Sequence, residues 1–287
     1  VAVTGVQTCA LPICVFPLAF TLDHIGPMTR SVRDAAVALN VLAGHDARDP
    51  GSSAHSHGDF CAGLDRGLVG LRIGFVRHFH EDDVPAHPEV TAALDVAAKV
   101  LKQEGARVTD IELPPLTELA GVSRLFMMAE SWTVHAKWLK ERPYDYSETS
   151  RRKLMSGAFL SAADYVHAQQ RRLQLTDAVN AAFDNVDILL CANSLDPACR
   201  IDDESELTRT YPRQARSPFN LTGHPALALM CGLSKNGLPI SLQLVGRMHD
   251  EATVLRAGIG YERATEWHTM RAPVKSEGKP RKAKAKA

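Results

Sequence analysis

The sequence predicts a layered α/β domain with a mixed β-sheet. Two observations predict this fold class. Within 71–113 a short apolar run, a long amphipathic stretch and an alternating run follow one another, which is the spacing of a β–α–β unit with parallel strands. Within 225–245 two apolar runs flank Asn236-Gly237, a dipeptide typical of antiparallel hairpin turns. Parallel and antiparallel pairs together make the expected sheet mixed.

The first expected elements are a helix, a connection and the β–α–β unit. Arg30–Ala43 has apolar residues at helical spacing, and Gly44 supplies a stop. The stretch 45–68 is rich in Asp, Gly, Ser and His and is typical of a surface connection. The unit that follows consists of a strand at Leu71–Val76, a helix at His87–Glu104 ending at Gly105, and a strand at Arg107–Leu113.

Two longer helices are expected next, at Leu116–Leu139 and Ala158–Phe183. In the second, Ser161 is expected to cap the turn that includes Asp164. The remaining elements are a strand at Asp187–Ala192 covered on both faces, a polar loop at 193–217, hairpin strands at Pro225–Cys231 and Pro239–Val245, and a closing helix at Asp250–Trp267.

Charge is distributed unevenly along the chain. The 287 residues carry 33 Lys and Arg against 33 Asp and Glu, but 271–287 has seven basic residues and one acid. The tail is therefore +6 and the rest −6. This excludes a wholly basic nucleic-acid binder and leaves an acidic body with a basic tail that we expect to be disordered.

The sequence favours a cytoplasmic protein. No window approaches the roughly 18–20 apolar residues of a membrane-spanning helix. The most apolar stretch, at the N-terminus, is interrupted by polar residues and prolines and lacks the basic start of a signal peptide. The six cysteines form no Cys-x-x-Cys pair, as expected of reduced thiols.

Two serine patterns invite a catalytic interpretation, but both are incomplete. Gly51-Ser52-Ser53 lies in a polar connector without the strand-to-helix turn that would aim a nucleophile. Ser150-x-x-Lys153 puts a serine and a lysine on one helix face, but a basic lysine must be buried, and two arginines flank this one. A linker and a solvated helix start are the favoured interpretations.

A histidine-rich stretch resembles a metal cluster. His78, His80 and His87 lie near three acidic residues, but no second group of ligands stands at zinc spacing. A solvated loop is favoured, so neither a metal nor a cofactor is expected. From the residues alone, the chain is an α/β domain without a complete catalytic constellation.

Two segments carry a family resemblance. Val15–Arg30, VFPLAFTLDHIGPMTR, resembles the stretch of amidase signature enzymes that reads Ser-Leu-Asp-x-x-Gly-Pro-(Met/Leu)-(Ala/Thr)-Arg. The stretch 217–268 contains SPFNLTGHP and GLPISLQLVG, and it resembles that family's Pro-x-Asn-x-x-Gly-x-Pro and Gly-Leu-Pro-x-x-Leu-Gln signature. Order and spacing agree from Val15 to about Pro273.

The resemblance implies a fold and an activity. The family fold is a mixed sheet sandwiched between helices, and its members hydrolyse C–N amide bonds or transfer ammonia as components of transamidases. Catalysis in the family uses a Ser–cis-Ser–Lys triad that lies upstream of the stretch matching Val15. Here only 1–14 stand there, without Ser or Lys, so no catalytic residue can be assigned.

We therefore expect an N-terminally truncated chain that is catalytically silent on its own. Its predicted divisions are a non-native leader at 1–14, a partial amidase signature domain at 15–270 and the basic tail at 271–287.

The resemblance also implies site residues for a small-molecule amide substrate. Asp23 would lie near the nucleophile loop and pair with the Arg of the family's upstream Gly-Gly-Ser-(Ile/Val)-Arg motif; capping the turn at Gly26-Pro27 is the alternative. The expected pocket residues are Glu130, His135 and Trp138 on one helix, together with Asn220.

Other interpretations stay open. The amidase-like component of a transamidase binds glutamine through an acid shortly before Pro-x-Asn, but Tyr211–Arg216 contains none, which favours a stand-alone amidase. A non-enzymatic protein that contacts nucleic acid through 271–287 is the third hypothesis; no nucleic-acid or membrane partner is otherwise expected, and a homodimer is left open.

Overall fold

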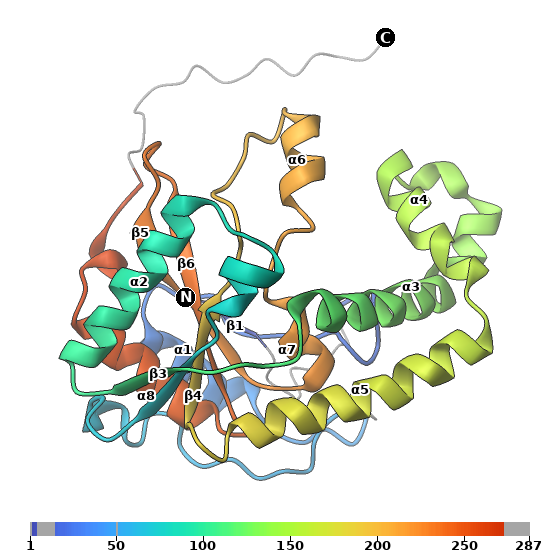
Figure 1. The fold of residues 1–287 in the computed structure, drawn as a ribbon. Coiled ribbons are helices and arrows are strands. Elements are labelled where there is room, and N and C mark those ends of the chain that lie inside the picture. Colours follow the sequence, from blue (N-terminus) through green and yellow to red (C-terminus); the bar gives the residue numbers. More distant parts are fainter. Residues whose placement is uncertain (1, 5–14, 50, 273–287) are drawn as a thin grey trace, which may run out of the picture.

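A six-stranded mixed sheet forms the centre of the molecule (Figure 1). The structure is a computed structural model that describes residues 2–4, 15–49 and 51–272. The strand order is β1-β5-β6-β4-β2-β3. The strands are β1 (Ala2–Thr4), β2 (Arg72–Phe75), β3 (Arg107–Asp110), β4 (Ile188–Ala192), β5 (Ala226–Leu233) and β6 (Pro239–Gly246).

Eight α-helices accompany the sheet in the described residues, and Figure 1 shows α2 and α8 to the left and α3, α5 and α7 to the right. They are α1 (Val32–Leu42), α2 (Pro88–Gln103), α3 (Leu116–Glu141), α4 (Glu148–Met155), α5 (Ala162–Ala182), α6 (Glu204–Thr210), α7 (Ser217–Thr222) and α8 (Glu251–Arg263). The predicted α/β fold with a mixed sheet is confirmed.

The pairing follows the sequence pattern. β2 pairs in parallel with β3 and with β4, whereas β4 and β6 run antiparallel. β5 and β6 form the predicted hairpin, whose turn places Gly237 at φ 74°, a conformation that glycine adopts without strain. Strand β1 pairs antiparallel with Ala226–Ala228 at the sheet edge, although its sequence shows no strand period.

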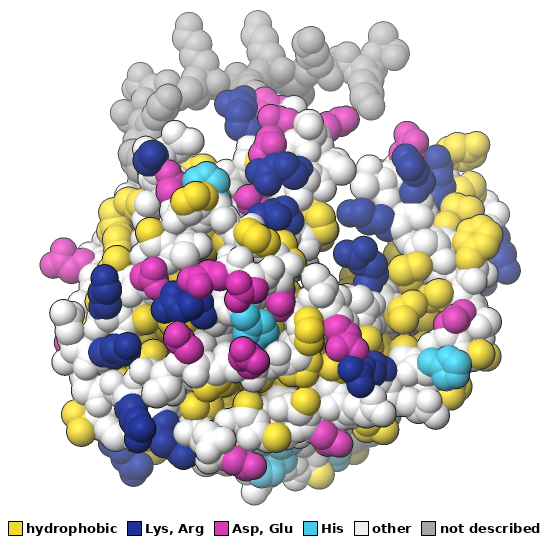
Figure 2. Space-filling model, in the orientation of Figure 1, with side chains coloured by type: hydrophobic (Ala, Val, Ile, Leu, Met, Phe, Trp, Pro, Cys, Tyr) yellow, Lys and Arg dark blue, Asp and Glu magenta, His cyan; other side chains and the backbone are white. Residues whose placement is uncertain are grey.

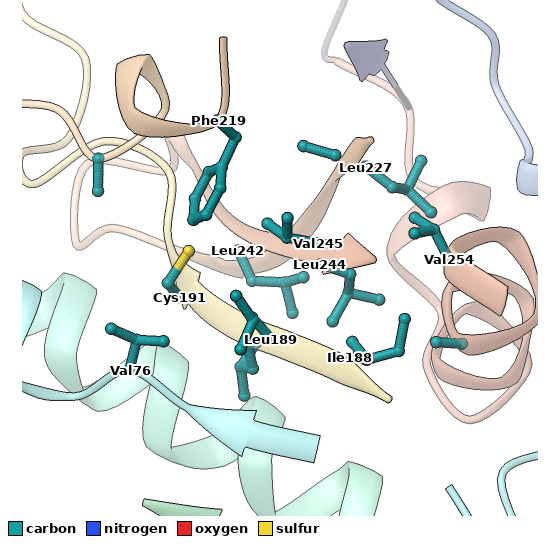
Figure 3. Packing of buried hydrophobic residues seen from close by; sticks show 14 of the residues in the cluster. Val76, Ile188, Leu189, Cys191, Phe219, Leu227, Leu242, Leu244, Val245 and Val254 are labelled. Carbon is teal, nitrogen blue, oxygen red and sulfur yellow. The ribbon is translucent and has the colours of Figure 1, made fainter. Parts of the chain in front are cut away.

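The core is built from the central strands. All five residues of β4 are buried, as predicted for a strand covered on both faces. Figure 3 shows its Ile188 and Leu189 packed among Leu242 and Leu244 of β6, with Val254 of α8 nearby. This continuous apolar layer fixes the sheet against the helices.

Short helices occupy stretches expected to be loops. The predicted loop at 193–217 contains α6, whose first turn is capped when the side chain of Asp203 accepts from the Glu206 N–H. Conversely, the last predicted helix ends at Arg263 rather than Trp267. The predicted cap of α5 is confirmed, because Ser161 and Asp164 form a reciprocal capping box.

Helices α3 and α5 extend away from the sheet and carry α4 at their far end (Figure 1). No helix in the described parts of the chain is long and apolar enough to cross a membrane. Most of the predicted leader (residues 1 and 5–14) and most of the basic tail (273–287) lie outside the described residues.

Candidate functional site

The segment Val15–His24, called here the anchored segment, is the point on which the predicted site residues converge. It folds back on itself through Asp23, whose Oδ2 accepts from the backbone N–H groups of Leu18 (2.7 Å) and Ala19 (3.1 Å). Asp23 therefore stabilises the turn before it rather than the one at Gly26-Pro27. Its carboxylate is exposed, at the surface of the segment.

Glu130 of α3 holds the middle of the anchored segment. Its Oε2 accepts from the Thr21 N–H at 2.8 Å, and its Oε1 accepts from the Thr21 hydroxyl at 2.7 Å and from the Tyr165 hydroxyl at 3.0 Å. Glu130 is only 9% exposed. Burial and the neighbouring Glu130 charge raise the pKa of Tyr165, so its hydroxyl stays a donor.

Arg172 of α5 closes the same contact from the opposite side. It donates to the Thr21 hydroxyl (2.9 Å) and carbonyl (3.1 Å), and its Nε donates to the Leu221 carbonyl at 2.6 Å. Its guanidinium lies 5.0 Å from the centroid of the Phe126 ring. Burial lowers the pKa of Arg172 while the Glu130 charge raises it, so the two buried charges offset each other.

Asn220 of α7 holds the end of the anchored segment. Its Nδ2 donates to the Leu22 carbonyl at 3.0 Å, and His24 Nδ1 lies 2.7 Å from the same oxygen. Burial lowers the pKa of His24. The backbone of Leu22 is therefore fixed by two side chains.

The other predicted residues hold the start of the anchored segment by aromatic contact. The Phe16 ring lies 5.4 Å from His135 and 5.3 Å from Trp138, centroid to centroid. His135 Nδ1 is 2.9 Å from the Tyr146 hydroxyl, and burial lowers the pKa of His135. Phe16 itself remains 60% exposed.

Glu130, His135, Trp138 and Asn220 thus contact one segment. They do not line the hollow of about 510 Å³ bordered by residues of 28–30, 229–230 and 261–270, or that of about 440 Å³ beside α2. Their role in a substrate pocket stays a prediction, as does the pairing of Asp23. Tyr165 and Arg172 were missed; their spacing of seven residues on one helix was the available signal.

Neither serine pattern forms a catalytic group. Ser150 accepts from the Ser147 hydroxyl at 2.9 Å at the exposed start of α4, while the Lys153 amine lies 4.6 Å from the Tyr211 ring centroid. The amine therefore faces an aromatic ring rather than a hydroxyl.

The connector serine does have a neighbouring imidazole. Ser52 Oγ lies 2.7 Å from His45 Nδ1, but it also donates to the Asp46 carbonyl at 3.1 Å and accepts from the Asp46 N–H at 2.9 Å. These backbone contacts are those of a hydroxyl that stabilises a turn.

The three histidines of the suspected metal cluster have separate environments. His78 Nε2 accepts from the Leu113 N–H and His87 Nδ1 from the Glu89 N–H, whereas His80 is buried. The solvated loop expected here is wrong, because 79–83 forms a π-helical turn that buries His80. The described residues contain no group of three or more His, Cys, Asp or Glu placed to hold a metal.

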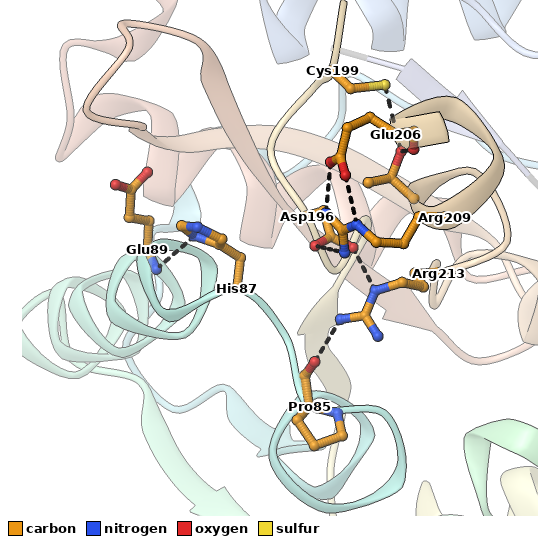
Figure 4. A network of polar contacts seen from close by, with 9 residues as sticks. Pro85, His87, Glu89, Asp196, Cys199, Glu206, Arg209 and Arg213 are labelled. Carbon is orange, nitrogen blue, oxygen red and sulfur yellow. Dashed lines mark hydrogen bonds and ion pairs between the residues drawn. The ribbon is translucent and has the colours of Figure 1, made fainter. Parts of the chain in front are cut away.

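The fold supplies an acid next to the stretch Tyr211–Arg216. Figure 4 shows Asp196 between Arg209 and Arg213, which donate to its carboxylate at 3.2 and 2.6 Å. Arg213 also donates to the Pro85 carbonyl at 2.6 Å. The Asp196 side chain is only 6% exposed, so its charge is used within the protein. Figure 2 shows further Lys and Arg side chains over α6 and the facing end of α4.

Known proteins share both this sequence and this fold. The family model Amidase matches residues 7–255. An amidase of Pseudomonas putida is 36% identical over 88% of this chain and 56% of its own length. The amidase-like chain of the glutamyl-tRNA(Gln) amidotransferase of Chloroflexus aggregans is 34% identical over the same shares.

The structural neighbours agree. A chain from a vestigial protein complex linked to the origins of an s-triazine catabolic enzyme superposes with a TM-score of 0.77 at 29% identity, covering 86% of this chain and 55% of that one. A bacterial aryl acylamidase of the amidase signature family gives 0.73 at 26% identity, with 86% and 54% covered. The chain spans about half the length of the relatives it matches. It belongs to the amidase signature family.

Proposed function

We propose that this chain is one part of an amidase that hydrolyses C–N bonds of small-molecule amides. The observation that carries the proposal is the family match over 7–255. The rigid hold on the anchored segment supports it, because Val15–Arg30 is a stretch that resembles the family signature. In this proposal α3, α5 and α7 position a wall of the substrate pocket.

The proposed division of labour places the triad in sequence that precedes the match to Val15. Asp23 accepts both of its backbone hydrogen bonds through Oδ2. We propose that Oδ1 accepts from the arginine of the upstream family motif and so positions the nucleophile loop. No serine hydroxyl donates to a lysine amine in the described residues, so the 287-residue chain is proposed to be silent alone.

Amide turnover by two proteins tests this function. One is the 287-residue chain, and the other joins residues 15–287 to the upstream segment of the Pseudomonas putida relative. With a nitroanilide substrate, we expect nitroaniline release only from the joined protein. Asp23→Asn in the joined protein should lower kcat while its thermal unfolding midpoint is unchanged. An unaltered kcat would contradict the role of Asp23.

A component of a glutamyl-tRNA(Gln) or aspartyl-tRNA(Asn) amidotransferase is the second candidate, favoured by the 34% identity to the Chloroflexus aggregans chain. Asp196 is the acid that the structure places beside the Tyr211–Arg216 stretch, and two arginines already engage it. A free carboxylate for glutamine is therefore missing from this place, which favours the stand-alone amidase. Co-purification of the joined protein with the other components of such an amidotransferase would support the second candidate instead.

The remaining expectations stay predictions. They are the cytoplasmic location, the homodimer, and contact with nucleic acid through a tail of which 273–287 lie outside the described residues. Salt-dependent binding of nucleic acid that is lost on deleting 271–287 would support the last of these.

A further inference from the structure

His80 is a buried polar side chain without a function in the candidate site. It lies in the π-helical turn Phe79–Asp83 and is 1% exposed, with its ring 5.5 Å from the Phe75 ring. Within the described residues, neither ring nitrogen makes a hydrogen bond of good geometry. The Val76 carbonyl favours a proton on the ring, which leaves the other nitrogen as an acceptor. Leaving such a group unsatisfied is costly.

His80 borders the hollow of about 440 Å³. The other bordering residues are Glu81, Pro85, Ala86, Pro88, Thr91, Ala92 and Asp95. The hollow lies just beyond the carboxyl end of β2 and beside the start of α2. Strand β2 sits between β4 and β3, and the chain leaves it first toward β3 and later toward β4. Ligands of open α/β sheets bind at such a switch point.

The charges around the hollow are unbalanced. The Arg77 guanidinium donates to Glu81 at 2.9 Å and to Asp95 at 2.7 Å, and its Nε lies 3.5 Å from Asp110. Three carboxylates therefore share one cation among the ion pairs of the described residues. Figure 2 shows acidic side chains gathered around basic ones between α2 and the π-helical turn. The surplus is negative, which excludes an anionic ligand.

We propose that this hollow binds a small primary alkylammonium ion. An ammonium group donates three hydrogen bonds, and His80, Glu81 and Asp95 provide acceptors on its border. Glu81 and Asp95 keep 37% and 41% of their side chains exposed, so they are open to a ligand. Pro85, Pro88 and their neighbours offer an apolar surface for the alkyl chain. No described group is placed to hold a metal. This inference does not depend on the proposed amidase function.

Calorimetric titration of the 287-residue chain with n-butylammonium chloride at low ionic strength tests the proposal. We expect saturable binding at millimolar concentrations. Glu81→Gln and Asp95→Asn should each weaken it about tenfold, since each removes a charged acceptor. His80→Phe should abolish it. Glu104→Gln, an exposed change at the far end of α2, is the matched control and should bind as the parent does.

Two further probes separate charge from chain. Sodium butyrate and butanol share the alkyl chain but lack the cation, and neither should bind. The proposal is overturned if n-butylammonium gives no saturable heat, or if Glu81→Gln and Asp95→Asn bind it as the parent does. Saturable binding of magnesium chloride without binding of the amine would also overturn it. Thermal unfolding of each variant confirms that the protein remains folded, and the two exposed carboxylate variants keep the test valid if His80→Phe unfolds.

Discussion

Glu130→Ala is the substitution that most directly probes the hold on the anchored segment. The carboxylate accepts two hydrogen bonds from Thr21 and one from Tyr165, and it offsets the buried charge of Arg172. Alanine removes all of these contacts at once. Because Glu130 is 9% exposed, water cannot readily replace the carboxylate.

The magnitude follows from these contacts. A hydrogen bond to a charged group contributes about 1.5–3 kcal/mol, and removing one partner of a buried charge pair costs about 3–5 kcal/mol. The contributions are not additive, and Arg172 keeps its contacts to backbone carbonyls. We therefore expect the free energy of unfolding to fall by about 3 kcal/mol.

Urea unfolding of the 287-residue chain measures this loss, with Glu118→Ala as the control. Glu118 also links α3 to α5, through Arg171 at 2.6 Å, but both side chains are partly exposed. The control should therefore cost about 1 kcal/mol or less. Equal losses for the two variants would refute the reasoning that burial makes the Glu130 network the stronger link.

Two further predictions concern the core and the corner between α3 and α4. Burial lowers the pKa of His224 from 6.5 to about 4, so the unfolded chain takes up its proton first and stability falls as the pH drops through this range, by about 3 kcal/mol. Urea midpoints measured across that range should change less with pH in His224→Gln, and an unchanged slope would contradict this. A Cβ on Gly157 would overlap the Met128 carbonyl, whereas one on Gly121 would meet nothing within 4 Å. Gly157→Ala should cost about 1–3 kcal/mol and Gly121→Ala should stabilise by up to about 1 kcal/mol, an order that melting temperatures would check.

The fold could largely be predicted because its main elements are encoded locally. The hairpin is marked by Asn236-Gly237 and the start of α5 by Ser161 and Asp164, and each signal lies within a few residues of the structure it specifies. Helix α6 could not be predicted in the same way. It is short and polar, and the contacts of Arg209 and Arg213 with Asp196 depend on the folded chain.

The site divides along the same line. Family resemblance selected Glu130 and Asn220, but their common partner segment became visible only in the fold. Thr21 lies 109 residues from Glu130 and 151 from Arg172 along the chain, so no local pattern joins them. His80 was assigned to a solvated loop because strand-like alternation was assumed after Leu71–Val76. The π-helical turn changes that direction and buries the ring.

Amide turnover by the 287-residue chain alone, compared with the protein carrying the upstream segment of the Pseudomonas putida relative, tests the central claim most directly. The account predicts nitroanilide hydrolysis by the joined protein and none above the uncatalysed rate by the chain alone. Hydrolysis by the purified chain alone, at a rate that tracks its concentration, would contradict the account.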